Sequence, residues 1–269
     1  MVARIDIDGA LALVTGAGSG IGRETAIALT RRGARVMCTG RTVEAVEETA
    51  AMCGAAAAGY RLDVTDRAAM EALAAQIGAD HGPVDILVNN AGVGLVGRFA
   101  DLTAADWDWV RSTNLDGVVH GCAVFAPGML ARGRGHIVNL ASGLAYIYPP
   151  TQPAYVATKA AVLALSRSLR GDFATRGVGV TVICPGVTNT PILGSTRFVG
   201  DQDDEHVRAR SQKLFARGHT PQKVAGVIVR SIERDRSVVP VGFEAWIGWW
   251  LQRYLPVRAH QAFGKLPLT

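Results

Sequence analysis

The sequence predicts an α/β fold in which helices cover both faces of a doubly wound, Rossmann-type parallel sheet of about seven strands. Short apolar or β-branched runs alternate with amphipathic, alanine-rich segments, which is the pattern of β-α units. A glycine-rich turn follows the first apolar run, where such a strand leads into a helix. No linker, repeat or change in composition divides the chain, so residues 1–269 are expected to form a single domain.

The predicted elements follow one another in strict alternation. The strands are short apolar or β-branched runs at 11–15, 35–39, 59–62, 84–89, 136–140, 178–183 and 237–241. The helices are the longer segments between them, at 20–32, 43–52, 67–79, 105–131, 153–176 and 221–234. The helix over 153–176 is apolar around most of its circumference, so one side is expected to face the sheet and another a second subunit, with burial by neighbouring helices as the alternative.

The composition favours a folded chain with a sizeable core over a disordered one, since hydrophobic residues make up 49% and charged residues 19% of the 269 residues. A net charge of +5 and a sequence pI of about 9.3 are read as ordinary surface charge, with an anionic cofactor or an anionic membrane surface as alternatives. No run of lysines and arginines is dense enough for a nucleic-acid groove.

The cysteines and the termini suggest a cytoplasmic protein. Cys38, Cys53, Cys122 and Cys184 show no C-x-x-C pair and no metal-ligand spacing, so a reducing compartment is expected and a metal site is not. The N-terminus lacks the pattern of a signal peptide, and no apolar stretch is long enough for a transmembrane helix.

A tyrosine and a lysine carry the main chemical signal. Tyr155 and Lys159 stand four residues apart in a predicted helix, so their side chains leave the same face, and Ser142 precedes the tyrosine by thirteen residues. An ammonium near a phenol favours the phenolate, so the pKa of Tyr155 is expected to fall toward the operating range of a proton donor.

The glycine-rich turn predicts a phosphate-binding loop. Gly16, Gly20 and Gly22 follow a strand and open a helix, which allows close approach of the backbone and directs a helix N-terminus at a pyrophosphate. Their spacing is a variant of the common dinucleotide-binding pattern.

Taken together, these motifs resemble those of the short-chain dehydrogenase/reductase family, in its single-domain form, from about residue 11 to residue 241. The matching pieces are Thr15–Gly22 with its TGxxxGxG pattern, Asp63-Val64, Asn89-Asn90-Ala91-Gly92, Asn114, Ser142, the YxxxK pair Tyr155 and Lys159, and Pro185-Gly186 with Thr190. Their joint order and spacing are specific, whereas each piece alone is common.

The resemblance implies four catalytic residues. Tyr155 would exchange the proton with the substrate oxygen, and Ser142 would hydrogen-bond the same oxygen. Lys159 would bind the nicotinamide ribose and lower the tyrosine pKa, and Asn114 would hold a water that links the lysine to solvent. Tyr146 and Tyr148, which lack a cation four residues later, are read as packing or pocket wall.

The resemblance also implies a set of cofactor contacts. Asp63 would accept from the adenine amino group, or else merely start a turn. The backbone of Val187 and the Thr190 side chain would contact the nicotinamide carboxamide. The full predicted set is Gly16, Ser19, Gly20, Ile21, Gly22, Arg41, Asp63, Val64, Asn90, Ala91, Gly92, Tyr155, Lys159, Pro185, Gly186, Val187 and Thr190.

The end of the second strand favours NADP over NAD. An NAD-binding site needs a carboxylate about 20 residues after the glycines, but Gly40 stands there and Arg41 follows. A guanidinium suits a 2′-phosphate. Against this, Ser19 stands where many NADP-binding relatives carry a second basic residue.

The residues expected beside the nicotinamide are mostly apolar, which predicts an apolar ketone, aldehyde or alcohol as substrate. These residues are Val93, Gly94, Leu95, Val96, Gly143, Leu144, Tyr146, Gln152, Val187 and Ile192. Segment 192–215 mixes charges of both signs and is expected to form a mobile, solvated lid.

From about residue 243 the chain is rich in aromatic residues, with Phe243, Trp246, Trp250 and Tyr254 on one helical face and Pro256 ending the helix. This extension is expected to pack on its own or a neighbouring subunit, to cover the pocket, or to make a peripheral contact with a membrane.

The sequence therefore predicts an NADP(H)-dependent oxidoreductase, a homodimer or homotetramer, with Tyr155 as acid and base. An NAD-dependent alcohol dehydrogenase, and an epimerase or dehydratase of the same family, are the enzymatic alternatives. A dinucleotide-sensing binding protein is the non-enzymatic one, although such a sensor does not need a proton relay.

Overall fold

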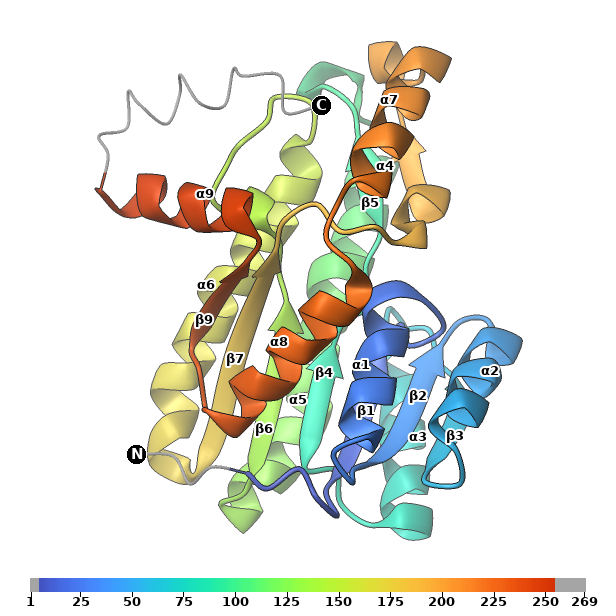
Figure 1. Cartoon of the computed structure of the whole chain (residues 1–269), viewed down its shortest axis with the longest axis vertical. Coiled ribbons are helices and arrows are strands. Elements are labelled where there is room, and N and C mark those ends of the chain that lie inside the picture. The colour runs from blue at the N-terminus through green and yellow to red at the C-terminus, as the bar shows by residue number, and fades with distance from the viewer. Residues whose placement is uncertain (1–4, 255–269) are drawn as a thin grey trace.

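The computed structural model describes residues 5–254, and its centre is a seven-stranded parallel sheet in the order β3-β2-β1-β4-β6-β7-β9 (Figure 1). The strands of this sheet are β1 (Leu11–Thr15), β2 (Arg35–Gly40), β3 (Ala57–Arg61), β4 (Ile86–Asn89), β6 (Gly135–Leu140), β7 (Val178–Pro185) and β9 (Val238–Val241). The helices are α1 (Gly20–Thr30), α2 (Val43–Cys53), α3 (Arg67–His81), α4 (Ala104–Arg111), α5 (Gly117–Arg132), α6 (Pro153–Phe173), α7 (Glu205–Ala216), α8 (Pro221–Glu233) and α9 (Phe243–Tyr254). The predicted fold class is confirmed.

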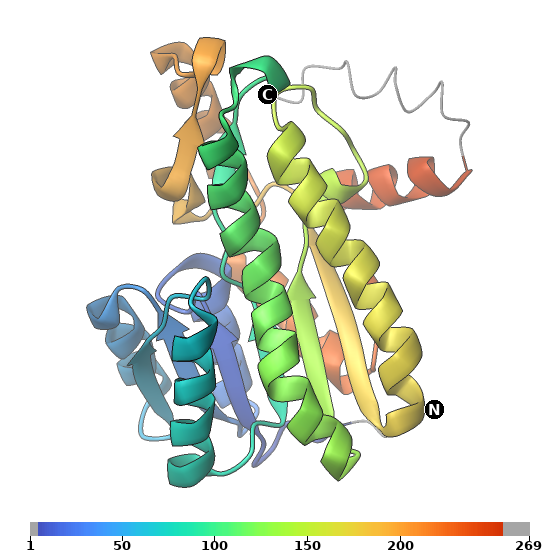
Figure 2. The same cartoon turned by 180° about the vertical axis from the view of Figure 1, so that it is seen from behind.

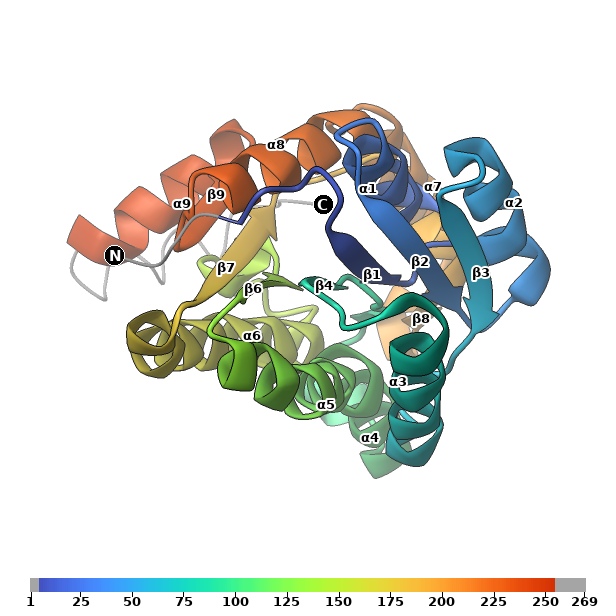
Figure 3. The same ribbon diagram turned by 90° about the horizontal axis from the view of Figure 1, so that it is seen from below.

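Different helices bury the two faces of the sheet, as the view from below shows (Figure 3). Along β1, Leu11 and Leu13 join a core with residues of α3, α5 and α6, the helices that cross the face seen in Figure 2. Ala12 and Val14 point the other way, into a core with residues of α1, α2 and α8. Because successive side chains of a strand alternate between faces, a strand covered on both sides reads as a continuous apolar run.

The strand order reverses beside β1, which pairs with β2 on one side and with β4 on the other. In doubly wound sheets this reversal leaves a crevice at the carboxyl ends of the strands, where ligands bind. The glycine turn leaves the end of β1, and Asn90 follows the end of β4. The topology therefore brings two of the predicted cofactor segments to one place.

The helix predicted over 105–131 is interrupted. A π-helical turn, Ser112–Asp116, separates α4 from α5. Asn114 lies within this wider turn and is fully buried. Single π-helical turns inside α-helices are frequent at functional sites.

The segment predicted as a mobile lid contains regular structure. A short strand, β8 (Thr196–Phe198), pairs with β5 (Gly94–Val96) in a small second sheet. The following helix, α7, begins after Asp204, whose carboxylate accepts the backbone N–H groups of His206 and Val207. Neither element was predicted from the sequence.

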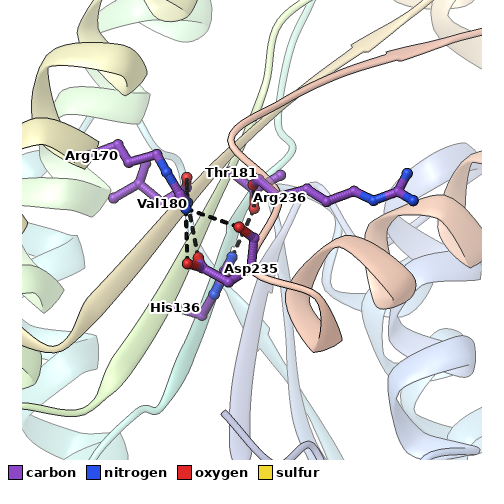
Figure 4. A network of polar contacts seen from close by, with 6 residues as sticks. All are labelled: His136, Arg170, Val180, Thr181, Asp235 and Arg236. Atoms are coloured by element: carbon purple, nitrogen blue, oxygen red, sulfur yellow. Dashed lines mark hydrogen bonds and ion pairs between the residues drawn. The ribbon is translucent and has the colours of Figure 1, made fainter. Parts of the chain in front are cut away.

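A buried polar network ties the amino-terminal ends of β6 and β7 to the turn before β9 (Figure 4). His136 Nε2 lies 2.8 Å from the Thr181 hydroxyl, which donates to the Arg236 carbonyl at 2.5 Å. Arg170 donates to both carboxylate oxygens of Asp235, at 2.9 and 2.8 Å. Since the threonine gives its only proton to a carbonyl, the histidine is the donor to the threonine oxygen. Burial lowers the pKa of His136 to about 4.

The aromatic extension forms α9, which runs outward from the body of the protein (Figure 1). Its predicted end at Pro256 lies outside the described residues. Among residues 5–254, no helix is both long and apolar enough to cross a bilayer.

Candidate active site

A cavity of about 980 Å³ opens at the carboxyl ends of the central strands. All predicted cofactor residues except Gly22 line it, as does Ser142. Gly22 and Asn114 lie behind its wall, and their contacts are described below. The dispersed sequence motifs thus converge on one cavity, since parallel strands all end at the same edge of their sheet.

The glycine turn leaves room for a ligand because side chains are excluded there. Gly16 and Gly20 have φ values of +62° and +54°, which favour glycine. A Cβ on Gly22 would lie 2.2 Å from the Gly16 carbonyl oxygen, so this position also requires glycine. The turn leads into α1 at Gly20, and the first N–H groups of that helix can bind an anion. This cradle fits a pyrophosphate.

Asn90 fixes the glycine turn rather than only lining the cavity. Its Nδ2 donates to the carbonyl oxygens of Thr15 and Gly16 at 2.9 and 3.1 Å. The Thr15 hydroxyl in turn accepts from the backbone N–H groups of Asn90 and Ala91 at 3.0 and 3.1 Å. The ends of β1 and β4 are therefore locked together beside the phosphate cradle.

The far end of the cavity carries the residues predicted to meet the adenosine. Arg41 follows β2 and is exposed at the rim. Asp63 Oδ1 accepts from the Thr65 N–H and hydroxyl, both at 2.9 Å, so this carboxylate does start a turn. Val64 is buried against the π-helical turn region, where a Cβ on Gly117 would lie 2.7 Å from it.

Ser142, Tyr155 and Lys159 form the opposite wall. Ser142 follows β6, and its hydroxyl accepts from the Leu144 N–H at 3.1 Å. Tyr155 and Lys159 lie on α6, and the lysine is buried. Lys159 Nζ donates to the Leu140 carbonyl at 3.0 Å and lies 5.9 Å from the centre of the tyrosine ring.

The predicted fall of the tyrosine pKa is wrong for this structure. Burial raises the pKa of Tyr155 above its ordinary value, and a hydrogen bond with the Ser142 side chain lowers it only in part. Burial also lowers the pKa of Lys159, to about 8. Loss of hydration disfavours the charged form of each group.

Asn114 acts on the loop after β4. Its Oδ1 accepts from the Val93 N–H at 2.8 Å, and its Nδ2 donates to the Val93 carbonyl at 2.9 Å. A Cβ on Gly92 would lie 3.3 Å from Asn114 Oδ1 and 3.4 Å from Lys159 Nζ. The amide oxygen and the ammonium therefore border the same small space, which fits the predicted relay.

Two residues that the sequence analysis missed hold the loop after β7. Glu244, in the first turn of α9, accepts from the Val187 N–H through Oε1 at 3.0 Å, and its Oε2 lies 3.3 Å from His219 Nε2. The backbone N–H of His219 donates to the Val187 carbonyl at 2.8 Å. Both backbone groups of Val187, predicted to meet the carboxamide, are thus already bonded. In the sequence, Gly186 marks this close approach without identifying the partner, because a Cβ there would lie 2.0 Å from Glu244 Oε1.

The substrate side of the cavity is mainly apolar. Most of the predicted lining residues lie there, but Leu95 is buried in the core and the Tyr146 hydroxyl donates to Cys184 Sγ at 3.1 Å. One further part of the cavity wall was not predicted. It comes from α7, where Val207, Leu214 and Phe215 face the cavity.

The fold and this cavity define an α/β protein built to hold a dinucleotide beside a phenol and an amine. Residues 10–198 match the model of the short chain dehydrogenase family. The chain belongs to this family of oxidoreductases, which use a nicotinamide dinucleotide.

Curated relatives and solved structures agree with this assignment. The chain is 43% identical over 255 residues to the probable oxidoreductase EphD of Mycobacterium tuberculosis, covering 91% of this chain but 43% of that protein. The chain therefore spans less than half the length of this relative. It is 37% identical over 226 residues to the 2-keto-3-deoxy-L-fuconate dehydrogenase of Xanthomonas campestris, covering 83% of this chain and 74% of the relative. A short chain dehydrogenase/reductase from Burkholderia phymatum, solved with NAD, superposes with a TM-score of 0.84 at 31% identity over 93% of each chain.

Proposed function

We propose that this protein is an NADP(H)-dependent oxidoreductase that interconverts a carbonyl group and a primary or secondary alcohol on an apolar substrate. The observation that carries the proposal is the convergence of Ser142, Tyr155 and Lys159 on the cavity that the glycine turn opens. When bound, the nicotinamide supplies the hydride or accepts it.

The residues of the chain manage the proton and the charge. Burial raises the pKa of the partly buried Tyr155 phenol, so it is protonated at neutral pH and ready to donate its proton to a carbonyl oxygen. The Ser142 hydroxyl donates a second hydrogen bond to that oxygen as its charge develops. The Lys159 ammonium stabilises the phenolate that remains, and Asn114 supports the water through which the proton is replaced.

The preference for NADP is based on Arg41. It lies at the cavity rim directly after Gly40, where an NAD-binding site would place a carboxylate. A hydrogen bond to a charged group contributes about 1.5 to 3 kcal/mol, so Arg41→Ala should weaken NADPH binding roughly tenfold to a hundredfold. NADH binding should change little, because NADH lacks the 2′-phosphate.

Titration of tryptophan fluorescence with NADPH and NADH measures both affinities. Arg35→Ala is a matched control, because Arg35 is exposed at the opposite end of the same strand. Tighter binding of NADH than of NADPH by the wild-type protein would refute the preference. Oxidation of NADPH with a panel of apolar ketones and aldehydes then tests the activity itself.

We further propose a cytoplasmic homo-oligomer. The four cysteines are free thiols in the structure, which suits a reducing compartment. The subunit contact is assigned to the outer side of α5 and α6, where Val119, Leu165, Leu169 and Phe173 line an apolar groove of about 280 Å³. The aromatic side of α9 is the surface proposed for peripheral membrane contact.

A further inference from the structure

Helix α9 packs inward through Ala245, Gly248 and the partly buried Trp249, and four large aromatic residues lie on its outer side. Ala245 and Gly248 are buried against the turn after Ser142, where a Cβ on Gly248 would lie 2.9 Å from Ile147. Four aromatic residues face solvent, and together they are named the aromatic face of α9: Phe243 (77% exposed), Trp246 (45%), Trp250 (53%) and Tyr254 (60%). Beyond the side that packs on the core, the helix thus exposes a contiguous apolar stripe, which marks an interaction surface.

The aromatic face is ordered by contacts along the helix. Trp249 lies edge-on to Trp246 and to Trp250, with ring centres 5.6 and 5.8 Å apart. Trp250 stacks on Tyr254 at 4.6 Å. The guanidinium of Arg253 lies 5.4 Å from the Trp249 ring and 5.9 Å from the Tyr254 ring. A cation therefore sits beside this row of tryptophan and tyrosine rings.

The charge of the C-terminal sequence is entirely positive. After Glu244 the chain contains Arg253, Arg258 and Lys265 and no aspartate or glutamate. Tryptophan and tyrosine favour the interface between water and lipid, where one part of the ring is buried and the polar atom stays hydrated. Basic residues near such a surface each add about 1 kcal/mol of attraction to anionic lipids. Aromatic rings and cations without acidic residues thus match an anionic bilayer better than a neutral one.

The same helix borders the cavity. Glu244 and Ala245, in its first turn, line the cavity, and the aromatic face continues outward from there. A surface bound to this face would lie next to the apolar, substrate side of the cavity. This arrangement suits a substrate that partitions into lipid.

We propose that the aromatic face of α9 binds the surface of an anionic lipid bilayer. Its 12 residues extend about 18 Å, so the helix lies in the interface rather than across the membrane. The aromatic rings enter the headgroup region, and Arg253 contacts the lipid phosphates. The proposal is independent of the cofactor assignment.

Flotation of the full-length protein with vesicles tests the proposal. Wild type should float with vesicles of phosphatidylcholine mixed with phosphatidylglycerol, and much less with phosphatidylcholine alone. Trp246→Ser combined with Trp250→Ser should lower the partition coefficient about tenfold or more, since two large apolar side chains no longer leave water. Met52→Ser is the matched control, because Met52 on α2 is 54% exposed and should leave binding unchanged.

A second measurement needs no variant. Brominated lipids should quench the tryptophan fluorescence of the wild-type protein if the rings enter the bilayer. Wild type that stays unbound with anionic vesicles, or a double variant that binds like wild type, overturns the proposal. So does a wild-type dimer that the double variant loses while neither protein binds vesicles, because a second copy would then cover the face.

Discussion

His136 should make the protein less stable as the pH falls below 6.5. The ordinary pKa of histidine, 6.5, applies to the unfolded chain, whereas burial lowers it to about 4 in the fold. Asp235 opposes this shift by favouring the charged ring, and Arg170 adds to it. The folded state thus holds the imidazole neutral. The neutral imidazole contributes its full stabilisation of the fold above pH 6.5. This stabilisation is lost as the pH falls from 6.5 toward 4, because the unfolded chain then binds the proton first.

The difference of about 2.5 pKa units corresponds to about 3 kcal/mol at pH 4, since one unit is worth about 1.36 kcal/mol. His136→Gln removes the titration and keeps an N–H that can donate to Thr181. Urea unfolding at a series of pH values from 7 to 4 gives the free energy of unfolding of both proteins. Wild type should lose about 3 kcal/mol more than the variant over this range.

Carboxylates also titrate in this pH range, so the test depends on the difference in the free energy of unfolding between wild type and the His136→Gln variant. His206→Gln is the control, because it makes the same exchange at an exposed position of α7. Parallel curves for wild type and His136→Gln would refute the reasoning, because they would mean that the imidazole is charged or hydrated in the folded state.

Three further outcomes are expected. Tyr155→Phe should lower kcat at least about a hundredfold while the dissociation constant of NADPH, measured by fluorescence, stays within a few fold of wild type; unchanged turnover would contradict the acid–base role. Gly22→Ala should weaken NADPH binding and cost about 1 to 3 kcal/mol in urea unfolding, because its Cβ would lie 2.2 Å from a carbonyl oxygen, whereas Gly78→Ala, with nothing within 4 Å, should be neutral or stabilising. Leu169→Glu in the apolar groove should convert an oligomer to monomers in light scattering, and an unaltered mass would exclude this groove as the contact.

The strands of the large sheet were predictable because the sheet is covered on both faces. Most of them are dominated by apolar or β-branched residues, and in β1 the alternation of Leu11 and Leu13 with Ala12 and Val14 between the two cores shows why these four positions are all apolar. Strands β5 and β8 have three residues each, too few for any periodic signal. They form because the segments around 95 and 197 meet in space, which the local sequence does not reveal.

Helix α7 was missed although its pattern was present. Val207, Ser211, Leu214 and Phe215 recur at helical spacing and all face the cavity. Charged residues surround them, and an exposed helix with one narrow apolar side has a low mean hydropathy, so its sequence resembles that of a solvated loop. Charge content alone therefore does not distinguish a solvated loop from a helix that uses one side.

The contacts of Glu244 and His219 depend on the path of the chain after β9. The segment after β9 returns to the loop after β7. In the sequence, only the glycines where the two segments approach each other indicate this contact. A Cβ on Gly186 would lie 2.0 Å from Glu244 Oε1, and one on Gly242 would lie 2.2 Å from His219 Nε2. A glycine in a sequence does not say which side chain requires the space, so these residues could not be assigned in advance.

The pKa of Tyr155, at the centre of the site, could not be predicted from the sequence either. Spacing i,i+4 places Lys159 on the same side of α6, but it does not determine where the long side chain ends. The ammonium donates to the Leu140 carbonyl at 3.0 Å and is buried, whereas the phenol is partly buried. Burial disfavours each charged form, so the phenol keeps its proton and the lysine holds its own less tightly. A carbonyl substrate would thus meet the neutral phenol that donation requires, and the ammonium matters only after the proton has left.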